Sequence, residues 1–117
     1  MIQMGGPPAD FDWDSLTFSL TQTDLMYVAT CNLGDAWEPG QIKPYGMLEI
    51  DPAAGVLNYG QGIFEGMKSQ RTLQNRIILF RPEENARRFQ RGAARLGMPP
   101  VPESMFIDAV EQVVAAN

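Results

Sequence analysis

The chain has 117 residues, of which 44% are hydrophobic and 20% are charged, a composition typical of one globular domain and unlike a disordered tail or a fibrous repeat. It contains no histidine, which excludes Ser-His-Asp and Cys-His catalysis, histidine-ligated zinc and an imidazole general base. Cys31 is the one cysteine, so we expect no internal disulfide, no metal site built on paired cysteines, and a buried, inert thiol in a reducing compartment.

Charge is distributed unevenly along the chain, whose formal net charge is −5. Residues 59–97 hold eight of the nine basic residues and three acidic ones, a local net charge of +5. A cationic segment within an acidic protein favours a small anion such as phosphate or carboxylate over a nucleic acid, which requires a basic face across the domain. No apolar run reaches membrane-spanning length, and the first residues lack the features of a targeting peptide. We therefore expect no nucleic-acid or membrane partner. The expected location stays open between the cytoplasm and the interior of an organelle such as a plastid or mitochondrion.

The N-terminal half predicts an arm followed by two strands. Residues 1–15 contain a Gly-Gly-Pro-Pro run and no periodicity, which indicates a flexible N-terminal arm. Residues 25–31 are rich in β-formers and nearly continuously apolar, which predicts a strand buried on both faces. After a loop rich in proline and glycine, residues 47–50 are predicted to form a short second strand.

The C-terminal half predicts a hairpin followed by two helices. Residues 67–71 and 76–80 are predicted strands, and the four residues between them are a connection typical of hairpins. The helix predicted at 82–96 begins with a proline, carries acidic residues in its first turn and one apolar stripe, and is stopped by a glycine. A second amphipathic helix is predicted at 103–116. Together these elements predict an α+β domain, a small antiparallel sheet with two C-terminal helices packed on one side.

A glycine-rich segment, GQGIFEG at residues 60–66, precedes the predicted hairpin. It is similar to a dinucleotide-binding loop, but its third glycine comes one position late and no helix follows at once, so we favour a tight turn. Such a turn would hold Tyr59 and Phe64 at fixed positions around a small cavity. The alternative, which spacing alone favours, is that both aromatic side chains pack in the core.

The arginines of the predicted helix 82–96 divide by their angle around the helix axis. Three of them cluster opposite Phe89, as expected for a solvated face: Arg87, Arg91 and Arg95. Arg88 lies about 100° from Phe89, nearer the core edge, where its guanidinium could bind a phosphate through two hydrogen bonds. The alternative, which spacing alone favours, is that Arg88 pairs with an acidic residue such as Glu84, four residues earlier.

Two long stretches resemble one family. DPAAGVLNYGQGIFEGMKSQR (51–71) and RIILFRPEENARRFQRGAARLGMP (76–99) are similar to branched-chain amino acid aminotransferases, and TDLMYV (23–28) and FIDAVEQVVAAN (106–117) are similar to the plant and bacterial branch of that family. The resemblance begins at about Leu16 and continues to the last residue. It implies the smaller N-terminal domain of a fold-type IV enzyme that uses pyridoxal 5′-phosphate as its cofactor.

The resemblance also implies roles for particular residues. Arg88 matches the arginine that binds the cofactor phosphate. Tyr59 and Phe64 match aromatic residues that line the pocket for the branched side chain, with the tyrosine facing the active site of the partner subunit in a homodimer. Phe18 matches a further pocket aromatic. Such an apolar box would bind Leu, Ile and Val side chains by burial of area, at about 25 cal/mol per Å².

By the same resemblance, the catalytic lysine that forms a Schiff base with the cofactor lies in a larger C-terminal domain, beyond Asn117. Lys43 and Lys68 are the two lysines of this chain, and neither stands in the family's Schiff-base context. The chain departs from the family pattern because no aromatic residue follows Lys68, and because Pro102 stands where Ser or Thr would cap the last helix. We therefore expect residues 16–117 to be a truncated domain without activity by itself.

The expected function of the parent enzyme is transamination between Leu, Ile or Val and 2-oxoglutarate. Two alternatives remain open. A D-amino acid transaminase or a related lyase of the same fold would share the phosphate arginine but would vary the pocket segment LNYGQGIFEG (57–66). A non-catalytic fragment would instead dimerise or pack on a longer partner.

Overall fold

The structure is a computed structural model that describes residues 12–117. Most of the arm expected at 1–15 therefore lies outside the described residues. Within the remainder, Trp13–Ser15 form a short 3-10 helix, η1, and Asp12 caps its N-terminus. The Asp12 carboxylate accepts a hydrogen bond of 3.2 Å from the backbone N–H of Asp14, so this end of the arm has local structure that the sequence did not indicate.

The first sheet pairs β1 (Leu25–Val28) with β2 (Gln41–Pro44) in antiparallel fashion, with Leu25 opposite Pro44. β1 confirms the predicted strand, but it ends three residues early and is half-buried instead of buried on both faces. Since this sheet has two strands and packs against one helix, one of its faces is left uncovered.

The second strand is not where it was predicted. Residues 46–50 have no regular structure, and β2 lies earlier, at Gln41–Pro44. Pairing at that position sets Ile42 opposite Tyr27, and both residues are half-buried. Met47, Leu48 and Ile50 are exposed. The apolar pattern at 47–50 therefore does not face the core of the described chain.

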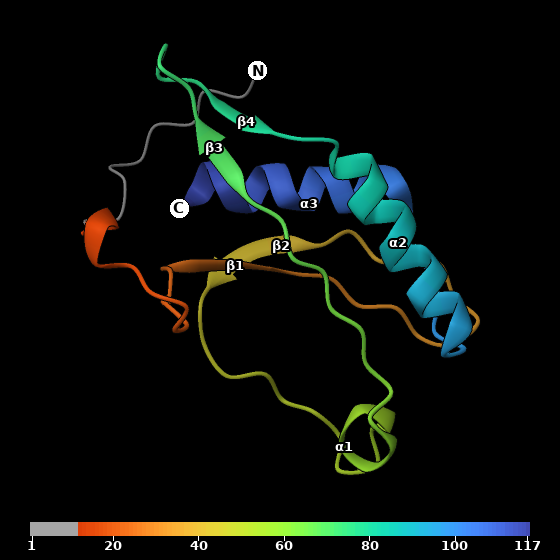
Figure 1. Cartoon of the computed structure of the whole chain (residues 1–117). Coiled ribbons are helices and arrows are strands. Elements are labelled where there is room, and N and C mark those ends of the chain that lie inside the picture. The colour runs from red at the N-terminus through yellow and green to blue at the C-terminus, as the bar shows by residue number, and fades with distance from the viewer. Residues whose placement is uncertain (1–11) are drawn as a thin grey trace.

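The predicted hairpin is confirmed. β3 (Ser69–Arg71) pairs antiparallel with β4 (Ile77–Leu79), and Asn75 in the connecting turn has a left-handed backbone with φ of 60°. The hairpin is a separate sheet, however, and in Figure 1 the two sheets lie on either side of the last helix. The α+β class is thus confirmed, with two small antiparallel sheets in place of one.

The two predicted helices are present as α2 (Pro82–Arg95) and α3 (Glu103–Ala116). Gly97, with φ of 68°, ends α2, and the N–H of Met98 donates to the carbonyl of Ala93 at 2.9 Å, as at a typical helix C-terminus. α3 packs on β1 and β2, whereas α2 packs on α3. The expectation that both helices cover the sheet directly is therefore correct for α3 alone.

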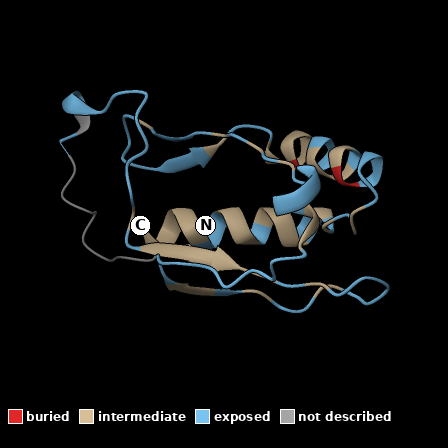
Figure 2. Cartoon of the chain, turned by 90° about the horizontal axis from the view of Figure 1, so that it is seen from below, coloured by how far each residue is buried: buried red, intermediate tan, exposed pale blue. Residues whose placement is uncertain are grey.

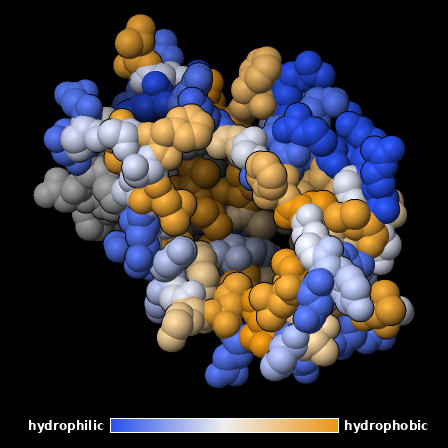
Figure 3. Space-filling view, turned by 60° about the horizontal axis from the view of Figure 1, so that its bottom comes forward, coloured by the Kyte–Doolittle hydropathy of each residue, from blue (hydrophilic) through white to orange (hydrophobic). Residues whose placement is uncertain are grey.

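The core is small. Ala86 and Ala93, both on α2, are the described residues that are buried, as Figure 2 shows. The accessible surface is 9557 Å², against about 6300 Å² expected for a compact protein of this mass. The radius of gyration is 15.8 Å, against about 13 Å expected. Figure 3 shows hydrophobic side chains gathered around a hollow on one face, so the chain leaves much apolar surface exposed.

Candidate functional site

A short helix precedes the segment predicted as a tight turn, residues 60–66. Gly55–Tyr59 form α1, and Gly60 follows with a left-handed backbone, φ of 62°. The N–H of Gly60 donates to the carbonyl of Gly55, which closes the helix. A glycine suits this position because side chains disfavour positive φ. The predicted turn at 60–66 is therefore correct for its first residue, Gly60, alone, because the chain continues from there along α2. The helical turn before it was not predicted.

After Gly60, the segment 61–66 runs along α2 and contacts it at every second residue. The side-chain amide of Gln61 donates to the carbonyl of Leu96 at 2.8 Å, beyond the end of the helix. Ile63 lies over Gly92, where an added Cβ would be 3.4 Å from its Cγ2 atom. Glu65 reaches Arg88 on the next turn. The segment is therefore attached along most of the length of α2.

The spacing of these contacts explains why the segment fits the helix. Two residues of extended chain span about 6.6 Å, and four residues of α-helix rise about 6.0 Å. Gln61, Ile63 and Glu65 therefore match positions 96, 92 and 88 of the helix. Because successive side chains of an extended chain alternate, Phe64 points away from α2, and it is 92% exposed.

The pair between Arg88 and Glu65 is the central contact of this site. Arg88 donates from Nε and Nη2 to the two carboxylate oxygens of Glu65, at 2.5 and 2.7 Å. The Arg88 side chain is 60% exposed and the Glu65 side chain 10%. Hydrogen bonding from Arg88 lowers the pKa of Glu65 despite its burial, and Asn85, which donates to Glu65 at 2.8 Å, acts in the same direction. The same pair raises the pKa of Arg88.

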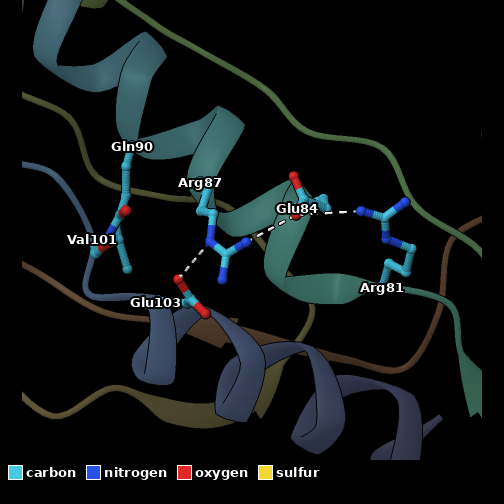
Figure 4. A network of polar contacts seen from close by, with 6 residues as sticks. All are labelled: Arg81, Glu84, Arg87, Gln90, Val101 and Glu103. Carbon is cyan, nitrogen blue, oxygen red and sulfur yellow. Dashed lines mark hydrogen bonds and ion pairs between the residues drawn. The ribbon is translucent and has the colours of Figure 1, made fainter.

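The alternative that Arg88 pairs with an acidic side chain is confirmed, but the partner is Glu65 and not Glu84. Glu84 pairs instead with Arg87 at 2.8 Å and with Arg81 at 3.4 Å. As Figure 4 shows, Arg87 also donates to Glu103 of α3 at 3.2 Å, a bond that raises its pKa. Arg87 thus links α2 to α3 and is not a free solvated side chain.

Arg88 does not stand apart from the remaining arginines of the helix. Arg88, Arg91 and Arg95 line one open cavity of about 550 Å³ together with Gly92. Residues three and four apart on a helix share a face, and this places the three arginines around the small glycine. The cationic face is therefore a cluster, in which Arg88 differs by its pairing with Glu65.

The aromatic residues expected to line a pocket are exposed. Phe18, Tyr59 and Phe64 are 110%, 89% and 92% exposed. The alternative that Tyr59 and Phe64 pack in the core is therefore wrong for the described chain. Neither described cavity is lined by these three side chains, so the structure does not bring them together with Arg88 into one enclosed pocket.

The remaining side chains that could take part in binding or reaction lie outside the site at Arg88 and Glu65. Lys68 and Asn85 line a cavity of about 230 Å³ between the hairpin and the start of α2, which the sequence did not indicate. Cys31 is half-buried, with its Sγ 3.4 Å from the carbonyl oxygens of Asn32 and Asp35. Among residues 12–117, no cluster of three metal-ligating side chains occurs. The helices of this same portion are too short or too polar to cross a bilayer.

Comparison with known proteins gives close relatives. The chain is 49% identical over 109 residues to the chloroplastic branched-chain-amino-acid aminotransferase 5 of Arabidopsis thaliana. It is also 49% identical over 109 residues to a chloroplastic branched-chain amino acid aminotransferase of Humulus lupulus, and 47% identical to a methionine aminotransferase of Arabidopsis thaliana. Each match covers 93% of this chain and 26% to 31% of the relative, so the chain spans between a quarter and a third of their length. No protein-family model matches it.

Proposed function

Because the chain is a homologue of the branched-chain amino acid aminotransferases, we propose that residues 16–117 are the N-terminal domain of an enzyme that transfers amino groups between branched-chain amino acids and 2-oxoglutarate. The observation that carries this proposal is the identity of 49% over 93% of the chain, which includes the cationic helix and the segment laid upon it.

Within this proposal, Arg88 binds the phosphate of pyridoxal 5′-phosphate. Its two bonds to Glu65 use two of the five N–H donors of the guanidinium, which leaves three for an anion. Arg91 and Arg95, on the same cavity, add positive charge that does not titrate near neutral pH. The residues present therefore fit a phosphate group. When bound, the cofactor supplies an electron sink that makes the α-proton of an amino acid acidic.

Neither lysine of the chain is proposed to be catalytic. Lys43 lies in β2, paired across the sheet with Met26, and Lys68 lines the small cavity beside the hairpin. The lysine that holds the cofactor would be supplied by the part of the enzyme that this chain does not include. The role of this chain is then to bind the phosphate and to shape the substrate pocket.

Tyr59, Phe64 and Phe18 are proposed to form one side of that pocket. Their exposure supports this role, because an apolar pocket completed by another domain or by a partner subunit leaves its first wall open in the isolated chain. Burial of a Leu or Ile side chain against such a wall contributes about 1.5–3 kcal/mol. The identity of 47% to a methionine aminotransferase favours a second candidate, an enzyme that also accepts the unbranched side chain of methionine.

Assembly and location are part of the same proposal. We propose a homodimer, which the exposed apolar surface would suit. The relatives named as chloroplastic, and a further branched-chain-amino-acid aminotransferase of Arabidopsis thaliana named as mitochondrial, favour the interior of one of these organelles.

The test uses a protein of the relatives' length that carries these residues. Glutamate formation from 2-oxoglutarate is followed with L-leucine, L-isoleucine, L-valine, L-methionine and D-alanine as donors. We expect turnover with the L-amino acids, and Phe64→Ala should lower kcat/KM for leucine. The control Leu73→Ala removes an equally exposed apolar side chain from the hairpin turn and should change nothing. Turnover with D-alanine alone would favour the D-amino acid transaminase, and no turnover with any donor would contradict the proposed transaminase activity and favour a non-catalytic protein.

A further inference from the structure

Glu65 is held firmly by side chains of α2, although the proposed function gives it no role. Its side chain is 10% exposed, and its carboxylate is held by three donors from α2: Nε and Nη2 of Arg88 and Nδ2 of Asn85. Asn85 also donates to the carbonyl of Gly66 at 3.2 Å, which fixes the backbone next to Glu65. A carboxylate shielded from water in this way is a rigid acceptor for the arginine.

We infer that Glu65 is a positioning residue, which orients the guanidinium of Arg88 so that its remaining N–H groups face an incoming phosphate. The inference rests on the proposed function of Arg88 as the phosphate ligand. An exposed arginine samples many rotamers, and a phosphate must order it upon binding. A two-bond pair fixes the plane of the guanidinium beforehand, and so removes part of that cost.

Two opposite effects decide whether Glu65 strengthens or weakens phosphate binding at Arg88. Its negative charge repels a phosphate, and removal of one charge at roughly 6 Å in water would tighten phosphate binding about threefold. Loss of the fixed orientation would instead weaken binding by about 2- to 12-fold, the range for ordering one long side chain. The two effects have opposite signs, so the change in affinity distinguishes positioning from simple repulsion.

Glu65 also connects the phosphate arginine with the proposed substrate pocket. Because Glu65 faces α2, its neighbour Phe64 faces away from the helix. The attachment of the segment at its other end, through Gln61 and the carbonyl of Leu96, is independent of Arg88. A variant at Gln61 therefore tests whether loosening the segment alone has the same effect as removing the carboxylate.

The experiment titrates the 117-residue chain with inorganic phosphate and follows the Nε–Hε signal of Arg88 by nuclear magnetic resonance. Glu65→Gln keeps the size of the side chain and removes its charge. Glu84→Gln makes the same change in net charge on a carboxylate that pairs with Arg87 and Arg81. We expect Glu65→Gln to weaken phosphate binding at Arg88 by up to about fourfold, which is what remains of a 12-fold orientation loss after a threefold gain from the lost repulsion. Glu84→Gln and Gln61→Ala should not weaken it.

Equal or tighter binding in Glu65→Gln would overturn the inference and favour repulsion. An equal weakening in Gln61→Ala would also overturn it, because a loosened segment would then account for the whole effect. If the Arg88 signal of the unsubstituted chain does not respond to phosphate, the phosphate role of Arg88 fails, and this inference fails with it. If that signal does respond, the phosphate role stands whichever way the Glu65 variant behaves.

Discussion

Replacement of Phe64 by alanine should leave the free energy of unfolding of the chain almost unchanged. The Phe64 side chain is 92% exposed, and truncation of an exposed side chain changes stability by less than about 0.5 kcal/mol. The matched change Phe89→Ala should be costly, because Phe89 is half-buried and its ring centroid lies 5.5 Å from that of Phe106. A fully buried Phe→Ala costs about 3–5 kcal/mol, so half-burial together with the lost ring pair gives about 2 kcal/mol.

Urea unfolding, followed through the helical circular dichroism signal, measures both variants. At an m-value of roughly 1.5 kcal/mol per molar urea, Phe89→Ala should lower the midpoint by about 1.3 M, and Phe64→Ala by less than about 0.3 M. Equal shifts of the urea midpoint in the two variants would place Phe64 in the core. That result would refute the conclusion that its ring is presented to a ligand or to a partner surface.

Three further expectations concern the chain by itself. It should form no glutamate from leucine and 2-oxoglutarate when pyridoxal phosphate is added, because neither Lys43 nor Lys68 has the Schiff-base context; turnover above that of the free cofactor would contradict the assigned roles. Its exposed apolar surface should make it bind a hydrophobic dye or self-associate as its concentration rises, whereas a chain that stays monomeric and binds no dye would count against this. Arg88 lowers the pKa of Glu65 below its ordinary value of 4.5, so the pair stabilises the fold above that pH, and this stabilisation is lost as the pH falls through the lowered value. Glu65→Gln should lack this acid-side loss, and identical acid unfolding profiles would argue against the ion pair.

The helices were predictable because their signals are local. A proline at the first position and Gly97 after the last turn bound α2, and the predicted and observed ends of α2 and α3 agree within one residue. The hairpin was equally predictable, since its two strands are joined by a short turn. These elements depend on neighbours in sequence and need little information about distant contacts.

The strand at 47–50 and the partner of Arg88 were not predictable for the opposite reason. The apolar residues at 47–50 are exposed and unpaired with any strand of the described chain, so their alternation was a misleading signal for a core strand. Helical spacing favoured Glu84 as the partner of Arg88, but Glu65, 23 residues earlier, provides both carboxylate oxygens in a less exposed position. One signal was present in the sequence. Residues 61, 63 and 65 are spaced two apart, and in extended chain this spacing has nearly the same length as the four-residue spacing of helix positions 96, 92 and 88.

The measurement that tests the central claim most directly is the retention of pyridoxal phosphate by a protein of the relatives' length carrying Arg88→Ala, Arg91→Ala or Arg95→Ala. Arg88→Ala should weaken cofactor binding by about 30-fold or more, because the proposed charge-assisted contact between the guanidinium and the cofactor phosphate is lost. The loss should be larger for pyridoxal phosphate than for pyridoxal. The other two variants, whose charges act through water, should weaken it less than about threefold. Equal losses for all three arginines, or an unaffected Arg88→Ala, would contradict a specific phosphate site at Arg88.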